Sequence, residues 1–337
     1  MKNKKQQIIL SGIQPTGELH LGNYLGALRN WVSLQDQYQC YFVLATYHSI
    51  SGNYQPADKA KQILSLTIDY LAAGLDPKKC VIFNQTDVPE TTELCWIFNT
   101  LTPLAELTRM TQFKDKAGKQ DKNINMGLLD YPVLQAADIL IYRANLVPVG
   151  KDQVQHVEIT RSIAKWFNQK YGVEYFPIPE AKLTPTAKIM SLADPEHKMS
   201  KSSGPKHYIA LNDSPETIKQ KIAKAVTGSG QEKEIPAGGQ NLLDLLAEFG
   251  TTEEIDYFKK QAQTKNIKYG ELKQTLAEAI AQFFEPYRQK RRELENDLNY
   301  VRKVLEEGAA QARPVAQKTI KEVKEIIGVN IDKIKKI

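Results

Sequence analysis

The sequence has little cysteine and no long apolar run, and each shortage excludes a class of protein. The three cysteines, Cys40, Cys80 and Cys95, form no Cys-x-x-Cys pair, which argues against a disulfide framework or a thiolate zinc site. No segment approaches the roughly 18 to 20 apolar residues that cross a bilayer, and only Ile8 to Leu10 follow the basic N-terminus as an apolar stretch. We therefore expect a cytoplasmic protein with neither a signal peptide nor a membrane span.

An excess of one charge sign is also small, with 45 Lys and Arg against 39 Asp and Glu, or +6 overall. Such a mild basic excess favours a polyanionic partner without identifying one. The histidines are scattered, with no His-Glu-x-x-His pattern, so we expect no metal held by the protein itself. The 337 residues, 42% hydrophobic and 25% charged, indicate an ordinary globular protein of about two domains.

Short apolar runs alternate with longer amphipathic stretches over residues 7–150, which is typical of a doubly wound parallel sheet. Four short strands are predicted there, at residues 7–10, 40–45, 80–84 and 146–149. Apolar residues at helical spacing predict a crossover helix that stops at Gly74, and residues 152–172 predict a long helix. The proline-rich stretch that follows predicts loop and short strand.

The character of the chain changes in its last third. Ser214-Pro215 is a favourable helix start, and from there the sequence is almost wholly helical. The predicted fold class is therefore α/β: a Rossmann-like, nucleotide-binding domain at residues 1–205, followed by a smaller all-helical domain at residues 206–337. The C-terminal helix of the second domain is able to pack back on the first.

A strand that runs into a glycine-bearing loop and then a helix occupies residues 11–23, an arrangement that suits phosphate. Gly12 and Gly17 have the spacing of P-loop glycines, but Glu18 and Leu19 stand where Lys and Ser or Thr are required, so we reject that motif. What remains is His20-Leu21-Gly22-Asn23 at the helix start. A plain strand-turn-helix unit explains these residues about equally well.

The segment Lys198-Met199-Ser200-Lys201-Ser202 places two ammonium groups three residues apart on a small, polar stretch. Lysine acts as a mobile point charge for phosphate, and a loop of this kind stabilises charge on a leaving pyrophosphate. A solvated, charged loop is the alternative interpretation.

Together the two segments resemble the His-Ile-Gly-His and Lys-Met-Ser-Lys-Ser signatures of class I aminoacyl-tRNA synthetases. The second matches at every position, whereas Leu21 and Asn23 replace Ile and the final His of the first. Residues 12–17, 127–140 and 147–161 are similar to the bacterial tryptophanyl-tRNA synthetases. The resemblance covers nearly the whole chain. It implies a ligase of protein synthesis that activates L-tryptophan with ATP and Mg²⁺, charges tRNA(Trp) and works as a homodimer.

Tyr131, Gln135 and Asp138 lie at i, i+4 and i+7, so they share one helix face if Pro132 opens a helix. A carboxylate in an apolar slot is costly unless a donor reaches it, and an indole N–H would do so. The resemblance makes Asp138 that acceptor, with Tyr131 and Gln153 at the amino-acid end. The alternative is that Asp138 caps a helix or forms a salt bridge within the fold.

The resemblance also implies roles toward ATP. It makes His20, Lys198 and Lys201 the catalytic contacts to the phosphates. Lys116, in a basic loop, is a candidate phosphate contact or a merely solvated lysine. The remaining residues that the resemblance assigns to ATP are Gln14, Pro15, Thr16, Gly22, Asn23, Gly150, Lys151, Asp152, Ile189, Met199, Ser200 and Ser202.

Two further features depart from the family. Gln135 stands where many bacterial relatives have Met, and Thr46-Tyr47-His48 replaces Asp-x-His, so His48 either contacts the substrate or is a satisfied residue at a strand end. A basic stretch of the helical region is expected to touch tRNA, unless it is only a solvated face: Arg288, Lys290, Arg291, Arg292, Arg302 and Lys303. A tyrosyl-tRNA synthetase and a non-catalytic relative that binds ATP or RNA remain the alternative functions.

Overall fold

The computed structural model describes residues 7–111, 113, 124–150, 153–183, 189–228 and 234–330. The chain forms two compact units, each drawn from separate stretches of sequence. The first consists of Met1–Gly17, Asn30–Thr184 and Asp297–Ile337, and the second of Glu18–Arg29 and Pro185–Asn296. These units differ from the predicted domains, since residues 185–205 fall in the second unit and the last helix in the first. A functional boundary at residue 205 stays a prediction.

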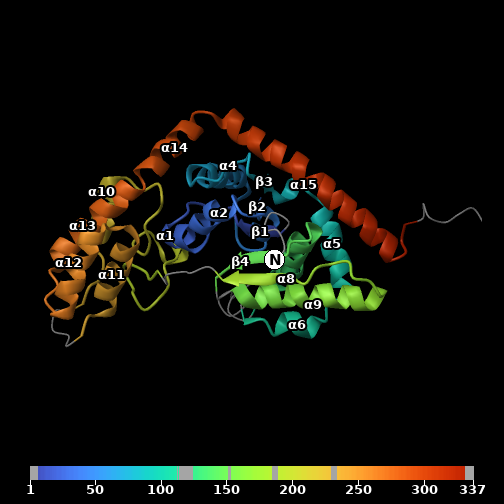
Figure 1. Cartoon of the computed structure of the whole chain (residues 1–337), viewed down its shortest axis with the longest axis horizontal. Helices are drawn as coiled ribbons and strands as arrows, with labels where there is room; N and C mark the ends of the chain where they lie inside the picture. The colour runs from blue at the N-terminus through green and yellow to red at the C-terminus, as the bar shows by residue number, and fades with distance from the viewer. Residues whose placement is uncertain are drawn as a thin grey trace, which may run out of the picture. The chain divides into compact units, whose positions relative to one another are not determined.

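A five-stranded parallel sheet forms the centre of the first unit, in the order β3-β2-β1-β4-β5 (Figure 1). The strands are β1 (Ile8–Ile13), β2 (Gln39–Leu44), β3 (Cys80–Asn84), β4 (Leu146–Val149) and β5 (Glu180–Leu183). The four predicted strands are confirmed, and β5 lies in the proline-rich stretch. Because β2 and β4 flank β1 on opposite sides, the strand order reverses between β1 and β4, where open α/β sheets bind ligands.

Helices cover this sheet, and the predicted Rossmann-like fold class is confirmed. They are α2 (Arg29–Leu34), α3 (Thr46–Ser49), α4 (Pro56–Ala72), the 3₁₀ turn η3 (Gln85–Asp87), α5 (Glu90–Asn99), α6 (Leu104–Thr108), α8 (Met126–Ile141), α9 (Val154–Tyr171) and α15 (Leu298–Ile326). The crossover helix α4 ends just before Gly74, whose φ of 106° suits a residue without a Cβ. In the core, Trp31 stacks on Phe42 with ring centroids 4.8 Å apart.

Helix α8 begins earlier than the sequence predicted. The shared face of Tyr131, Gln135 and Asp138 was predicted on the condition that Pro132 opens a helix. The helix instead starts at Met126, where the Asn125 side chain accepts a hydrogen bond from the Leu128 N–H at 3.0 Å. This cap satisfies the first turn. Pro132 then lies in the second turn, where its missing N–H costs only one intrahelical hydrogen bond.

The second unit is helical. Its elements are α1 (Leu21–Asn23), the π-helix η2 (Tyr24–Leu28), the 3₁₀ turn η5 (Lys201–Ser203), α10 (Pro215–Ala223), α11 (Ala237–Phe249), α12 (Thr252–Gln263), α13 (Tyr269–Phe283) and α14 (Glu285–Glu295). The predicted start at Ser214-Pro215 is confirmed, because the Ser214 hydroxyl accepts from the Thr217 N–H. In neither unit do the described residues include a helix long and apolar enough to cross a bilayer.

Helix α15 packs directly on the β3 edge of the sheet, and Gly308 makes this approach possible (Figure 1). A Cβ built at Gly308 would lie 1.8 Å from the Ile82 carbonyl oxygen, which is backbone and cannot rotate away. We predict that Gly308→Ala lowers the free energy of unfolding by about 3 kcal/mol or more, measured by denaturant titration.

The matched control is Gly270→Ala, at a helical glycine with open space around its Cβ position. That variant should be neutral or stabilised by up to about 0.5 kcal/mol, because alanine has the higher helix propensity. Equal stability of both variants would show that α15 does not need a glycine at this contact.

Candidate active site

Candidate site residues, three of them polar, follow the carboxyl ends of four neighbouring strands. Gln14 follows β1, Thr46 follows β2 by two residues, Gln85 follows β3, and Gly150 follows β4. Carboxyl ends of parallel strands meet at one edge of a sheet, so these residues are gathered there although they are far apart in sequence. The amino-acid part of the candidate site is built on this edge.

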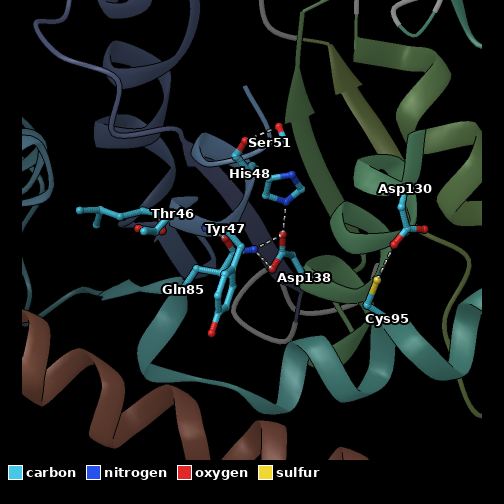
Figure 2. A network of polar contacts seen from close by, with 9 residues as sticks. Thr46, Tyr47, His48, Ser51, Gln85, Cys95, Asp130 and Asp138 are labelled. Carbon is cyan, nitrogen blue, oxygen red and sulfur yellow. Dashed lines mark hydrogen bonds and ion pairs between the residues drawn. The ribbon is translucent and has the colours of Figure 1, made fainter. Parts of the chain in front are cut away.

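Asp138 is buried, and two side chains donate to its carboxylate (Figure 2). The Gln85 amide nitrogen lies 2.7 Å from Oδ1 and 2.9 Å from Oδ2, and His48 Nε2 lies 2.8 Å from Oδ2. His48 is itself buried in the α3 turn, directly after β2. Asp138 is therefore a hydrogen-bonded acceptor that two strand ends hold in place, as burial of a carboxylate requires.

Tyr131 and Asp138 are buried on α8, and Gln135 between them is half-buried, as expected of positions i, i+4 and i+7. The Tyr131 hydroxyl lies 2.8 Å from Nε2 of His156, a buried residue of α9. Burial raises the pKa of Tyr131 to about 12, so the phenol stays protonated and able to donate. Gln153 is the N-terminal cap residue of α9 and is half-buried.

A pocket of about 440 Å³ opens beside His48 and Tyr131. This volume lies within the range of small-molecule sites. Its walls include His48 and Tyr131 as well as Cys95, Trp96 and Asp130. The Cys95 thiol donates to Asp130, and burial raises the pKa of Cys95 well above its usual range, so this cysteine is a neutral wall residue (Figure 2).

The loop after β1 carries Gln14 and Thr16, both exposed, on either side of the buried Pro15. Lys59 of α4 holds this loop, because its ammonium donates to the Pro15 carbonyl at 3.0 Å and to the Ser49 hydroxyl at 3.0 Å. Desolvation lowers the pKa of Lys59. Lys59 thus ties the predicted ATP loop to the end of the α3 turn.

His20 caps the short helix α1 in the second unit. Its Nδ1 accepts from the Gly22 N–H at 3.1 Å, and its own backbone N–H donates to Asn23 Oδ1 at 3.1 Å. A Cβ at Gly22 would lie 2.9 Å from the imidazole, so the glycine makes room for the His20 ring. Because Nδ1 accepts, the proton of the neutral ring is on Nε2, which is left as a hydrogen-bond donor.

The Lys198–Ser202 segment belongs to the same unit. Met199 is buried and its N–H donates to the Ile189 carbonyl at 3.0 Å, so the loop is anchored between its two lysines. Lys198 is exposed and Lys201 is half-buried at the start of a 3₁₀ turn. The Ser200 and Ser202 hydroxyls are hydrogen-bonded to each other at 2.9 Å. The segment therefore presents the ammonium groups of Lys198 and Lys201 on either side of the buried Met199.

His20 is electrostatically coupled to both lysines. Burial, then the charge of Lys201, then that of Lys198 lower the pKa of His20 to about 4. The ring is consequently neutral near pH 7 and serves as an N–H donor rather than a cation. Phosphate oxygens are acceptors that such a donor and two ammonium groups would bind.

Some predicted residues lie outside the described part of the chain: Lys116, Lys151 and Asp152. Sequence reasoning also missed three residues of the site, namely Gln85, His156 and Lys59. Gln85 carried a usable signal, because a polar residue directly after a buried strand points to the ligand edge of a parallel sheet. Among the described residues no group of three or more His, Cys, Asp or Glu side chains is arranged to hold a metal ion.

A parallel α/β sheet with these two signature segments defines a class I aminoacyl-tRNA synthetase. The family model described as tRNA synthetases class I (W and Y) matches residues 2–285, and the chain belongs to that family. The tryptophan--tRNA ligase of Clostridium acetobutylicum is 44% identical over 336 residues, which cover 97% of this chain and 98% of that protein. The enzyme of the same name from Rickettsia bellii is 45% identical over 96% of this chain and 99% of its own.

Solved structures agree with this assignment. The tryptophanyl-tRNA synthetase of Campylobacter jejuni, complexed with ADP and tryptophan, superposes with a TM-score of 0.84 at 34% identity, covering 95% of this chain and 99% of that one. The Mycoplasma pneumoniae tryptophanyl-tRNA synthetase superposes at 0.85 and 34% identity, covering 98% and 99%. A tyrosyl-tRNA synthetase from Archaeoglobus fulgidus, at 20% identity and a TM-score of 0.66, shares the fold.

The lowered pKa of His20 makes stability depend on pH. The unfolded chain takes up a proton on this ring near the ordinary histidine pKa of 6.5, whereas the folded chain does so only near 4. The stability that comes from keeping His20 neutral in the fold is therefore fully present above pH 6.5. It is lost as the pH falls toward 4, because the unfolded chain then binds a proton on His20 that the folded chain does not bind. We predict that the free energy of unfolding of the wild type falls, relative to that of His20→Asn, by about 2 kcal/mol between pH 7 and pH 4.5.

Denaturant unfolding of both proteins at each pH measures this difference. Asparagine is a good helix cap and can accept from the Gly22 N–H, so the variant keeps the local structure. Parallel pH curves for the two proteins would refute the buried, neutral state of His20.

Proposed function

We propose that this chain activates L-tryptophan with ATP and transfers it to tRNA(Trp), as a ligase of protein synthesis. The observation that carries the proposal is the buried Asp138 carboxylate of α8, which is oriented by donors that follow β2 and β3. Asp138 accepts the indole N–H, and Tyr131 and Gln153 bind the α-amino end. His48 stabilises Asp138, and Gln135 forms a polar wall of the slot.

In the first step the tryptophan carboxylate attacks the α-phosphorus of ATP, and the bond to pyrophosphate breaks. In the second step a ribose hydroxyl at the 3′ end of tRNA attacks the activated carbonyl, and AMP leaves. Neither step requires a protein nucleophile, so alignment and charge stabilisation supply the catalysis. His20 donates from Nε2, and Lys198 and Lys201 neutralise charge as it moves onto pyrophosphate.

The other predicted ATP contacts are proposed to hold and align the nucleotide. The loop at Gln14, Pro15 and Thr16 and the start of α1 at Gly22 and Asn23 bind the nucleotide, with Gly150 at the end of β4 and Ile189 beside the signature loop. Lys151, Asp152 and Lys116 are proposed to contribute as well. Mg²⁺ arrives on the ATP phosphates, which usually hold this ion. The family's role in translation supports a cytoplasmic location, which is part of the proposal.

The basic residues of α14 and of the start of α15 are proposed to contact tRNA. Arg288 and Arg292 bind Glu285, Arg291 binds Glu295, and Lys290 binds Glu293. The pairs of Lys290 and Arg292 are exposed and weak, so a polyanion can compete for these two cations. Arg288 is instead buried and also donates to the Ala281 carbonyl, so the structure does not favour its predicted contact with tRNA. A steep loss of tRNA binding with added salt tests this contact, and salt-independent binding would count against it.

We also propose that two copies of the chain associate. Trp96 and Met126 are each 71% exposed, which is unusual for large apolar side chains, and Ile50 is exposed beside Trp96 at the pocket. Sedimentation equilibrium should show a dimer for the wild type and a monomer for Trp96→Glu. A monomeric wild type would refute the dimer.

Exchange of labelled pyrophosphate into ATP tests the activation step. We predict exchange with tryptophan and not with tyrosine, and a turnover lowered about 100-fold in Lys198→Ala and Lys201→Ala, with the KM for tryptophan nearly unchanged. Lys206→Ala, an exposed lysine just beyond the signature loop, is the matched control and should behave as wild type. Exchange with tyrosine would identify the chain as a tyrosyl-tRNA synthetase, and exchange with neither amino acid would favour a non-catalytic relative.

A further inference from the structure

Gln85 has no role in the mechanism so far, yet it is among the most buried polar side chains of the first unit, at 1% exposure. It stands directly after β3, and its amide nitrogen reaches both oxygens of Asp138 (Figure 2). Buried polar side chains are retained when every group finds a partner, and Gln85 meets this condition at both ends of its amide.

The orientation of the Gln85 amide follows from its other contact. The Tyr47 backbone N–H donates to Gln85 Oε1 at 2.8 Å. A backbone N–H can only donate, so the oxygen of the amide must face Tyr47 and the NH₂ group must face the carboxylate. The main chain after β2 thus decides which end of Gln85 meets Asp138.

The carboxylate oxygens are used unequally. Among the described residues, Oδ2 accepts from both His48 and Gln85, whereas Oδ1 accepts from Gln85 alone. Each oxygen has two lone pairs, so Oδ1 keeps room for one more donor. The terminal torsion of an aspartate is broad, and a carboxylate with a single neighbour would rotate. Gln85 bridges both oxygens and removes that freedom.

We infer that Gln85 is a positioning residue for the amino-acid substrate: it fixes the Asp138 carboxylate so that Oδ1 accepts the ring N–H of tryptophan. The inference rests on the proposed function. In this chain of hydrogen bonds, the Tyr47 N–H donates to Gln85, Gln85 donates to Asp138, and Asp138 accepts from the substrate. Gln85 itself does not touch the reacting atoms.

Two substitutions test this chain of contacts. Gln85→Leu removes the donor at similar size, and Gln85→Glu places a carboxyl against Asp138. In pyrophosphate exchange at pH 7.5, both should raise the KM for tryptophan about 10- to 100-fold, the effect of losing a hydrogen bond to a charged group. The KM for ATP should change less than about twofold, because Gln85 is not among the residues proposed to bind ATP. A general loss of fold would instead raise the KM for both substrates.

The pH dependence separates positioning from packing. A carboxyl beside another carboxylate has a raised pKa and, once protonated, becomes a donor. In Gln85→Glu the KM for tryptophan should therefore fall toward the wild-type value as the pH is lowered from 8 to 5.5. The KM of Gln85→Leu should stay high throughout. Calorimetric titration of tryptophan, without turnover, should give the same trend in Kd.

Gln35→Glu is the matched control. Gln35 is a buried glutamine of the same unit, bonded to the Gly74 carbonyl and the Asp76 N–H. This variant should lose stability without any pH-dependent change in the KM for tryptophan. A folded Gln85→Leu enzyme with a wild-type KM would overturn the assignment of Gln85 alone. Failure of the wild type to exchange or bind tryptophan would overturn the proposed function as well.

Discussion

Burial of the Asp138 carboxylate is the constraint on which the amino-acid part of the site depends. A charge at such a position is tolerable only when donors surround it. The fold supplies them from different strands: His48 after β2 and Gln85 after β3, with Asp138 itself on α8. Parallel pairing of β2 with β3 brings the first two together, since Leu44 and Asn84 stand opposite each other in register. The acceptor therefore exists only when the sheet is formed.

The residues proposed to bind phosphate depend on a different electrostatic arrangement, in which a buried side chain is kept neutral. In the second unit, burial and two lysines act together on His20 and keep the ring neutral. A neutral imidazole whose Nδ1 is occupied by the Gly22 N–H can offer a single donor in a fixed direction. Asn23 completes the cap through its side-chain oxygen, at the position where the family signature has its second histidine. In the proposed mechanism, Lys198 and Lys201 supply the positive charge at the phosphates.

Much of this organisation could be predicted from the sequence, because it depends on local patterns. Four strands, the crossover helix that stops at Gly74, and the start at Ser214-Pro215 follow from hydrophobic spacing and capping rules. Helix α8 starts at Met126 and not at Pro132, because the Asn125 side chain caps its first turn. The partners of Asp138 could not be predicted, because Gln85 and His48 meet it only through strand order. Likewise, the contact of Gly308 with β3 depends on tertiary packing over more than 200 residues of chain.

Under the proposed function, the arrangement also indicates where substrate selectivity would arise. A carboxylate acceptor would take a proton donor from an indole N–H or from a phenol, so Asp138 alone does not separate tryptophan from tyrosine. Discrimination has to come from where the acceptor stands relative to the walls of the slot, because a donor misplaced by an ångström leaves a buried polar group unpaired. A directed chain from the Tyr47 N–H through Gln85 to Asp138 is a way to define that location.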